Sequence, residues 1–154
     1  MELKKLCKIG KGGFGIVWKA MDSLDDCYAM KIFLEKDNKD LDQNDLDSFK
    51  EIITELKNLL ILKGIDNIMS ITGIASNITK TKSVLGIVQN LMDSDLKAYL
   101  RDNPEATFQT KLIIAIQISK GLKAIHYRGF SHNDIKLGNV LINWKNERVP
   151  IAKL

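Results

Sequence analysis

Ser131-His132-Asn133-Asp134-Ile135-Lys136-Leu137-Gly138-Asn139-Val140-Leu141-Ile142 is a short polar stretch that runs directly into an apolar one. Asp134 could accept a proton, Lys136 could hold a negative charge and Asn139 could bind a metal ion. The apolar end predicts a buried strand, which would anchor the polar loop on one side as a catalytic loop requires. A turn rich in Asp and Asn that merely precedes a strand is the plainer alternative.

The composition is that of a folded domain. The chain has 154 residues, of which 45% are hydrophobic and 27% charged, and this excludes a disordered chain. The net charge of +4 comes from scattered lysines, so we expect no nucleic-acid partner. Cys7 and Cys27 have no framework spacing and are expected to be reduced, partly buried thiols. With no signal peptide and no membrane-spanning run, we expect a cytoplasmic protein without a membrane partner.

A glycine-rich stretch, Gly10-Lys11-Gly12-Gly13-Phe14-Gly15, fits the spacing G-x-G-x-x-G. The flanking segments 2–9 and 16–20 predict strands, so the glycines would form the tip of a hairpin. Backbone amides at such a tip can bind phosphates. The alternative is a dinucleotide-binding fingerprint, but that motif opens a helix and needs an acid about 20 residues later, where this chain has Met30-Lys31.

A predicted third strand over 27–33 places Ala29 and Lys31 on one face. Ala29 is small enough to leave space for a ring beside the lysine. A lone strand lysine is usually just solvated, and this remains the alternative for Lys31.

The helix predicted downstream offers this lysine a partner. After the acid-rich connector 34–47, Ser48 to Glu51 looks like a capping box, and apolar residues recur at helical spacing to residue 60. At about 100° per residue, Glu51 falls opposite the apolar stripe and Glu55 on its flank. Glu55 is therefore the predicted partner of Lys31, with an ordinary surface acid as the alternative.

The remaining elements complete a sheet and begin a helical region. Strands over 65–75 and 83–89 would make a five-stranded antiparallel sheet crossed by one helix. Asp95 is expected to cap a short helix over 96–100, and Thr107 a long one to Arg128. The long helix has Leu112, Ala115, Ile116, Ser119 and Leu122 on one face, and Ile113, Ile118 and Ile125 widen its apolar surface beyond one stripe. A helix this apolar is expected in a core, and in an incomplete domain it should also expose apolar surface. Strands over 140–142 and 149–154 form the last hairpin.

Five of these features resemble the eukaryotic protein kinases in type and order. The loop around Asp134 is similar to the kinase catalytic loop, Ala29-Met30-Lys31-Ile32 resembles the Val-Ala-Ile-Lys element, and 85–92 resembles the hinge. The resemblance implies an α+β, protein-kinase-like fold. A five-stranded small lobe with one helix would span 1–89, a hinge 90–95, and the first part of a mainly helical large lobe 96–154.

The resemblance also implies a protein kinase that uses ATP and Mg²⁺. Lys136, two residues after Asp134, resembles the serine/threonine type. Asp134 would align and deprotonate a substrate hydroxyl, Lys136 would stabilise the moving phosphoryl group, and Asn139 would hold Mg²⁺. Lys31, held by Glu55, would orient the phosphates. Asp95 would reach a ribose hydroxyl or serve only as a helix cap. The other nucleotide contacts would be Ile9, Gly10, Gly12, Gly13, Phe14, Gly15, Val17, Ala29, Gln89, Asn90, Met92 and Leu141.

Two departures from the family pattern carry expectations of their own. Asn133 stands where the family has arginine, so we expect no control by phosphorylation of an activation loop. The Asp-Phe-Gly element would follow Leu154, so we expect an incomplete kinase domain that does not turn over by itself. A pseudokinase-like nucleotide-binding or scaffold module is the alternative, although Lys31, Asp134 and Asn139 are retained. No residue indicates which protein would be the substrate.

Overall fold

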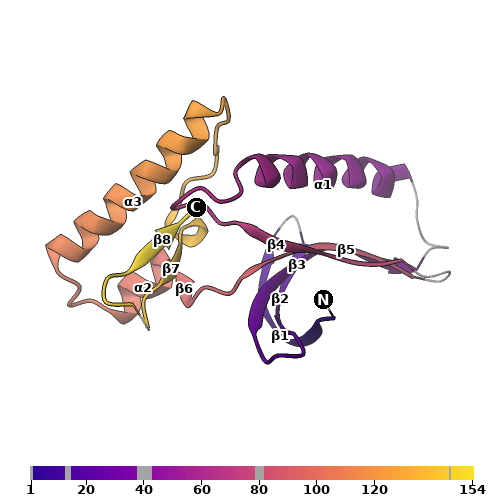
Figure 1. The fold of residues 1–154 in the computed structure, drawn as a ribbon, viewed down its shortest axis with the longest axis horizontal. Helices are drawn as coiled ribbons and strands as arrows, with labels where there is room; N and C mark the ends of the chain where they lie inside the picture. The colour runs from indigo at the N-terminus through magenta and orange to yellow at the C-terminus, as the bar shows by residue number, and fades with distance from the viewer. Residues whose placement is uncertain (1, 13–14, 38–42, 79–81, 146) are drawn as a thin grey trace. The chain divides into compact units, whose positions relative to one another are not determined.

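The computed structural model describes the backbone of residues 2–12, 15–37, 43–78, 82–145 and 147–154. The chain forms two compact units, one of Met1–Ile61 with Ser70–Leu91 and one of Leu62–Met69 with Met92–Leu154. Figure 1 labels their helices and strands. Residues 62–69, which the predicted small lobe included, belong to the second unit because they contact its last strand.

The first unit is built on a five-stranded antiparallel sheet, which confirms the predicted fold class. Its strands follow the order β1-β2-β3-β5-β4, and every neighbouring pair is antiparallel. Ala20, Met30, Ile32 and Val88 form the buried core on one face of this sheet. The bounds of the strands are β1 Lys4–Gly12, β2 Gly15–Met21, β3 Cys27–Asp37, β4 Ile71–Ile78 and β5 Lys82–Asn90.

Helix α1 (Gln43–Ile61) runs along the sheet (Figure 1). It begins at Gln43, five residues before the Ser48 at which a capping box was predicted. The later part of the segment predicted as a connector is therefore helical. Ile52 is buried on the helix, as the apolar stripe predicted.

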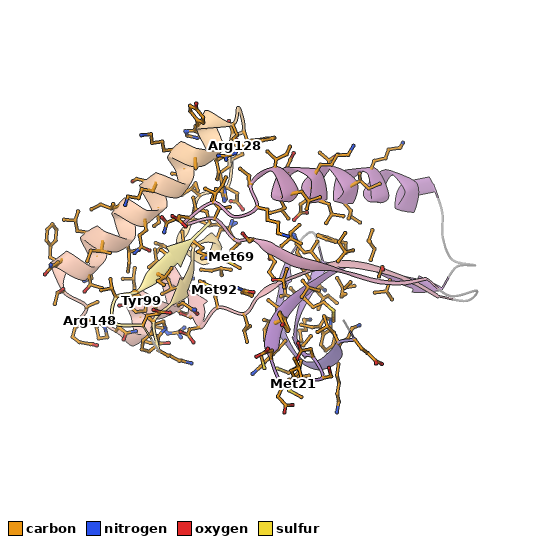
Figure 2. All side chains as sticks on the ribbon, in the orientation of Figure 1. Met21, Met69, Met92, Tyr99, Arg128 and Arg148 are labelled. Atoms are coloured by element: carbon orange, nitrogen blue, oxygen red, sulfur yellow. The ribbon has the colours of Figure 1, made fainter. Side chains whose placement is uncertain are left out.

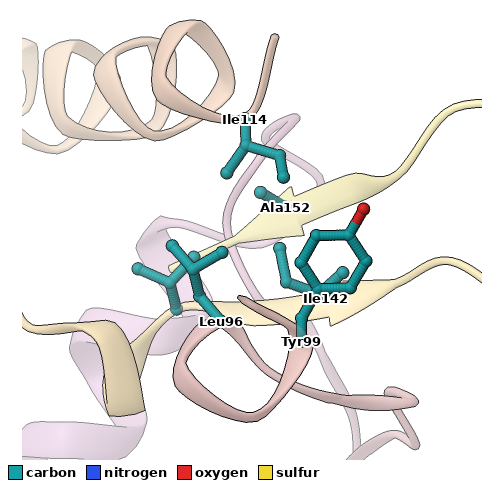
Figure 3. Close-up of a cluster of buried hydrophobic side chains, with 6 residues drawn as sticks. Leu96, Tyr99, Ile114, Ile142 and Ala152 are labelled. Carbon is teal, nitrogen blue, oxygen red and sulfur yellow. The ribbon is translucent and has the colours of Figure 1, made fainter. Parts of the chain in front are cut away.

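The second unit has a small sheet in the order β6-β7-β8 and two helices. Leu96, Tyr99, Ile114, Ile142 and Ala152 pack in its core together with Val140 (Figure 3). Both helix caps are as predicted: Ala98 N donates to Asp95 Oδ1 over 2.7 Å, and Thr110 N donates to Thr107 Oγ1 over 3.1 Å. The bounds are β6 Ser94–Asp95, α2 Leu96–Asp102, α3 Phe108–Tyr127, the 3₁₀ helix η2 Leu137–Asn139, β7 Leu141–Asn143 and β8 Ile151–Lys153.

The strand predicted over 65–75 is wrong in its first half. Strand β4 begins at Ile71, and the residues before it form turns in which Gly64 and Asn67 have positive φ angles of 80° and 62°. Ile68 is buried against Leu62 and Ile125. Its apolarity therefore reflects packing within the second unit and not a strand.

Helix α3 is buried on one side and exposes apolar side chains on another. Leu112 and Ile116 are 47% and 46% exposed, while Ile114, Gly121 and Ile125 are buried. The helix is apolar on several sides, so spacing alone could not identify the buried side.

Among the described residues, no helix is both long and apolar enough to cross a membrane. Both cysteines are free thiols, and Cys7 is exposed rather than partly buried.

Gly86 in β5 allows an unusually close approach of β3. A Cβ atom at residue 86 would collide with the carbonyl oxygen of Lys31 and lie 2.9 Å from Cδ1 of Ile32. Gly73 in β4 is a matched site without this crowding, because a Cβ there would lie 4.0 Å from Val88. The side-chain volume at residue 86 is therefore limited by the strand that carries Lys31.

We expect Gly86→Ala to lower the free energy of unfolding by about 2 kcal/mol, because the added methyl group overpacks the sheet. Gly73→Ala should instead raise it by up to about 1 kcal/mol, since alanine reduces the entropy of the unfolded chain. Urea unfolding followed by circular dichroism measures both changes. Equal effects of the two substitutions would contradict this account of Gly86.

Candidate active site

Four of the predicted site residues share one face of the five-stranded sheet. Val17 is directly opposite Lys31 across β2 and β3, and Ala29 is directly opposite Gln89 across β3 and β5. Opposite residues of an antiparallel pair point to the same side, as do residues two apart in a strand. The sheet register therefore brings these side chains together on the face opposite the core formed by Met30 and Ile32.

Lys31 contacts Glu55, the partner predicted from helix geometry. The Nζ atom of Lys31 lies 2.8 Å from Oε1 of Glu55, and the two side chains are 25% and 36% exposed. The same ammonium lies 4.6 Å from the ring centroid of Phe33, at cation–π distance. A half-buried lysine fixed in this way presents its charge in a defined position. Its binding of phosphate remains a prediction.

The glycine turn is described on both sides of its tip. Gly12 ends β1 and pairs with Gly15, which begins β2, while Gly13 and Phe14 lie outside the described residues. Gly15 has a φ of 134°, and a Cβ there would collide with the carbonyl oxygen of Ile32. Only glycine can therefore start β2 at this distance from β3.

Ile9 and Gly10 lie at an irregularity in the pairing of β1 with β2. The register shifts between Lys8 and Gly10, and the Ile9 side chain between them is 48% exposed. An exposed isoleucine is compatible with the predicted contact to a nucleotide base.

The predicted hinge residues follow the end of β5. Gln89 and Asn90 are its last two residues, and Met92 lies just beyond it (Figure 2). The Oδ1 atom of Asn90 accepts a hydrogen bond from the Thr72 hydroxyl over 3.0 Å. Asp95 is the N-cap of α2, so the structure shows the cap that was one of its two predicted roles.

Asp134, Lys136 and Asn139 lie together in the second unit. Lys136 Nζ lies 2.8 Å from Asp134 Oδ2, and Asn139 Nδ2 donates to the same oxygen over 2.7 Å. Asn139 Nδ2 also donates to the Asp134 carbonyl over 2.9 Å. The hydrogen bond from Lys136 and then that from Asn139 lower the pKa of the Asp134 carboxyl group below its ordinary value. The carboxylate is 62% exposed and remains ionised at neutral pH.

The loop gains its shape from the turn η2 and the strand after it. Asn139 N donates to Lys136 O over 2.9 Å, which closes the turn that brings the two side chains to Asp134. Val140 is 2% exposed, and its carbonyl accepts a bond from Leu96 N over 2.8 Å. Leu141 is half-buried in β7. Asn133 has a φ of 61°, a conformation that asparagine tolerates better than most residues.

The residues present are compatible with Mg²⁺. Within the described ranges, no group of three or more His, Cys, Asp or Glu side chains could form a metal site by itself. Mg²⁺ is usually held by one or two protein oxygens together with substrate phosphates, and not by a cage of protein ligands. The Asn139 amide nitrogen faces Asp134, so its amide oxygen is the atom that would bind the ion.

Asp93 has a structural role that the sequence did not reveal, since it was predicted only as part of the hinge 90–95. Asp93 Oδ2 accepts hydrogen bonds from Trp144 N over 2.8 Å and Lys145 N over 2.9 Å. Partial burial alone would raise the pKa of Asp93, but these two backbone donors outweigh it, and the pKa is lowered. Asp93 thus fixes the turn that follows β7. Its partners are about fifty residues away, so no local signal could have identified it.

We expect Lys136→Met to raise the pKa of the Asp134 carboxyl group toward that of an ordinary aspartate, because it removes the largest cause of the shift. The native pKa lies below the unfolded one, so the ionised group stabilises the loop above the unfolded pKa. This contribution is lost as the pH falls through the native pKa. Carbon-detected NMR titration measures the change, and the pKa of Asp93 in the same sample is the control. An unchanged Asp134 pKa would refute the contact.

Comparison with known proteins gives the same identification. The family model for the protein kinase domain matches residues 3–154. Serine/threonine-protein kinase NLK2 of Xenopus laevis is 35% identical over 141 residues, which cover 88% of this chain and 29% of the relative. The LRR receptor-like serine/threonine-protein kinase RGI5 of Arabidopsis thaliana is 32% identical over 92% of this chain and 13% of its own length.

A third relative is the putative serine/threonine-protein kinase L673 of Acanthamoeba polyphaga mimivirus. It is 30% identical over 88% of this chain and 23% of its own length. The chain thus spans between about an eighth and about three tenths of these relatives. The family model nevertheless covers nearly every residue of the chain. The chain belongs to the protein kinase family.

Proposed function

We propose that this chain provides the nucleotide-binding and proton-accepting residues of a serine/threonine kinase, which transfers a phosphoryl group from ATP to a protein hydroxyl. The observation that carries this proposal is the pair of charged clusters, Lys31 with Glu55 and Asp134 with Lys136 and Asn139. Phosphoryl transfer depends on positioning and on charge neutralisation more than on covalent chemistry by the protein. Two clusters of fixed charge are what such a reaction requires.

Lys31 is proposed to orient the phosphates of ATP. Glu55 holds the ammonium by an ion pair and leaves it partly exposed, so the charge is positioned without being enclosed. Val17, Ala29 and Gln89 lie on the same sheet face and would contact the base. The remaining proposed nucleotide contacts are the glycine turn at Gly10, Gly12, Gly13, Phe14 and Gly15, together with Ile9, Asn90, Met92, Asp95 and Leu141.

Asp134 is proposed to bind the substrate hydroxyl and accept its proton. The hydroxyl oxygen forms a bond to the terminal phosphorus of ATP as the bond from that phosphorus to the bridging oxygen breaks. The low pKa keeps Asp134 ionised for this role, and Lys136 offers its positive charge to the transferred group. Bound Mg²⁺ would neutralise charge on the phosphate oxygens, and the Asn139 amide oxygen would hold it.

We further propose that the kinase acts in the cytoplasm, which supplies ATP and keeps thiols reduced. Cys7 and Cys27 are free thiols in the structure, as this requires. The serine/threonine class is supported by Lys136 and by the three relatives, which are serine/threonine-protein kinases by name. The protein substrate is proposed only as a hydroxyl-bearing protein.

Lys31→Met should lower kcat/KM for ATP by about 100-fold or more, because it removes the charge that orients the phosphates. Lys8→Met is the matched control, since Lys8 is an exposed strand lysine opposite Trp18 on the other sheet face. The assay is Mg-ATP-dependent phosphorylation by the protein as its gene encodes it, with circular dichroism to check the fold. Full activity of Lys31→Met would contradict the proposal. A wild-type protein that binds ATP without turnover would favour the scaffold alternative.

Asp134→Asn should lower kcat by about 100-fold or more while the KM for ATP changes little, because the amide cannot accept the proton. Asp25→Asn is the control: Asp25 is an exposed turn residue with a φ of 65°, which asparagine also tolerates. Steady-state kinetics with ATP varied separates the two constants. A loss confined to KM would show that Asp134 binds nucleotide instead.

A further inference from the structure

The edge strand β8 is held by side-chain amides on the side that faces away from β7. Ala152 N donates to Gln117 Oε1, and Ala152 O accepts from Asn67 Nδ2 over 3.0 Å. Gln117 Nε2 also donates to Pro150 O over 3.0 Å. An edge strand has unpaired backbone groups, and here two amide side chains occupy the place of a neighbouring strand.

The backbone of residues 67–69 extends the same set of contacts. Leu154 N donates to Asn67 O over 3.0 Å, and Met69 N donates to Leu154 O over 2.6 Å. Met69 is labelled in Figure 2. We name these contacts of Asn67, Met69 and Gln117 with residues 150–154 the amide clamp. It joins three segments of the second unit that are far apart in sequence.

Two backbone features are specific to the clamp. Asn67 has a φ of 62°, a conformation that suits asparagine, and its carbonyl and side chain contact Leu154 and Ala152. Gly121 on α3 is buried, and a Cβ there would lie 2.8 Å from Asn67 O and 3.1 Å from Cδ1 of Leu154. The close approach of α3 to the clamp therefore requires glycine at that position.

The clamp is connected to the polar loop through the β7–β8 pairing. Ile142 lies opposite Ala152 and Leu141 opposite Lys153. Strand β7 starts two residues after Asn139, whose amide is bonded to Asp134. These strands have only three residues each, so their own pairing is weak and depends on what covers them.

We propose that Asn67 and Gln117 are positioning residues for the loop that carries Asp134 and Asn139, and that they act through the β7–β8 hairpin. Within the described ranges, no hydrogen bond joins the Asn67 or Gln117 side chain to this loop. This inference rests on the proposed function for its effect on catalysis. Its structural part, the coupling of the clamp to Asn139, can be tested without any activity.

The main variant is Asn67→Asp, which keeps the size and the tolerance of positive φ but removes the Nδ2 donor. Asn103→Asp is the matched control, because Asn103 Nδ2 likewise donates to a backbone carbonyl, that of Tyr99, over 2.9 Å at the end of α2. Asn67→Gly is a second variant in case Asn67→Asp does not fold, since glycine adopts the positive φ at no cost. Gln117→Glu removes the other amide donor and keeps its acceptor.

The first measurement is amide hydrogen exchange by NMR. Ala152 and Leu154 report on the clamp. Asn139, whose N–H bonds Lys136 in the loop, and Leu96, whose N–H bonds Val140 just before β7, report on the loop end. We expect Asn67→Asp and Gln117→Glu to lower the protection of all four amides by roughly three- to tenfold. Asn103→Asp should leave the protection of all four amides within about twofold of wild type, because the bond that it removes lies at the end of α2.

The second measurement is phosphorylation by the protein as its gene encodes it, with Mg²⁺ varied. Asn67→Asp should raise the Mg²⁺ concentration at half-maximal rate by roughly threefold or more, since a supporting contact tunes metal affinity. The KM for ATP should change less than this.

Loss of protection at Ala152 and Leu154, with Asn139 and the Mg²⁺ dependence unchanged, would overturn the proposal and leave the clamp a support for β8 alone. If the wild-type protein transfers no phosphoryl group, the proposed function fails. The exchange at Asn139 then still decides whether the clamp positions the loop.

Discussion

A solvent-exposed loop can keep three polar side chains within hydrogen-bond distance only if its ends are fixed by a core. Asp134, Lys136 and Asn139 are such a group, and more than half of the side-chain surface of Asp134 is exposed. The turn η2 leads directly into Val140 and Ile142, which are almost fully buried against Leu96 and Ile114. The apolar end of the stretch therefore sets the geometry of its polar part.

In the first unit, a sheet and one helix fix the charged side chain of Lys31. The partly buried ammonium of Lys31 would be costly without a partner, and Glu55 supplies one from α1. The strand that carries Lys31 is fixed by two close backbone approaches, at Gly15 and at Gly86. The charge is thus held by packing of the main chain as well as by the ion pair, which is the kind of positioning that phosphoryl transfer needs.

Much of this could be predicted from local pattern. The helix flank at Glu55 identified the contact with Lys31, and the caps at Asp95 and Thr107 began helices where expected. The prediction of a strand failed at residues 65–70, because apolar spacing alone does not show whether a residue packs in a strand or in a turn. Ile68 packs in a turn instead of a strand. On α3 the sequence left the inner face open, because a helix that is apolar on several sides does not specify it, and the structure buries Ile114 and Ile125 while Leu112 stays exposed.

The sequence by itself determined the family, the order of the strands and helices along the chain, and the residue types of both charged clusters. These depend on spacing over a few residues, where periodicity and turn chemistry act. Only the tertiary structure decided that Asn67 and Gln117 bind β8, that Asp93 fixes the turn after β7, and that residues 62–69 belong with the second unit. Each of these contacts joins positions more than thirty residues apart, and a hydrogen bond between an amide and a distant main-chain group leaves no periodic pattern in the chain.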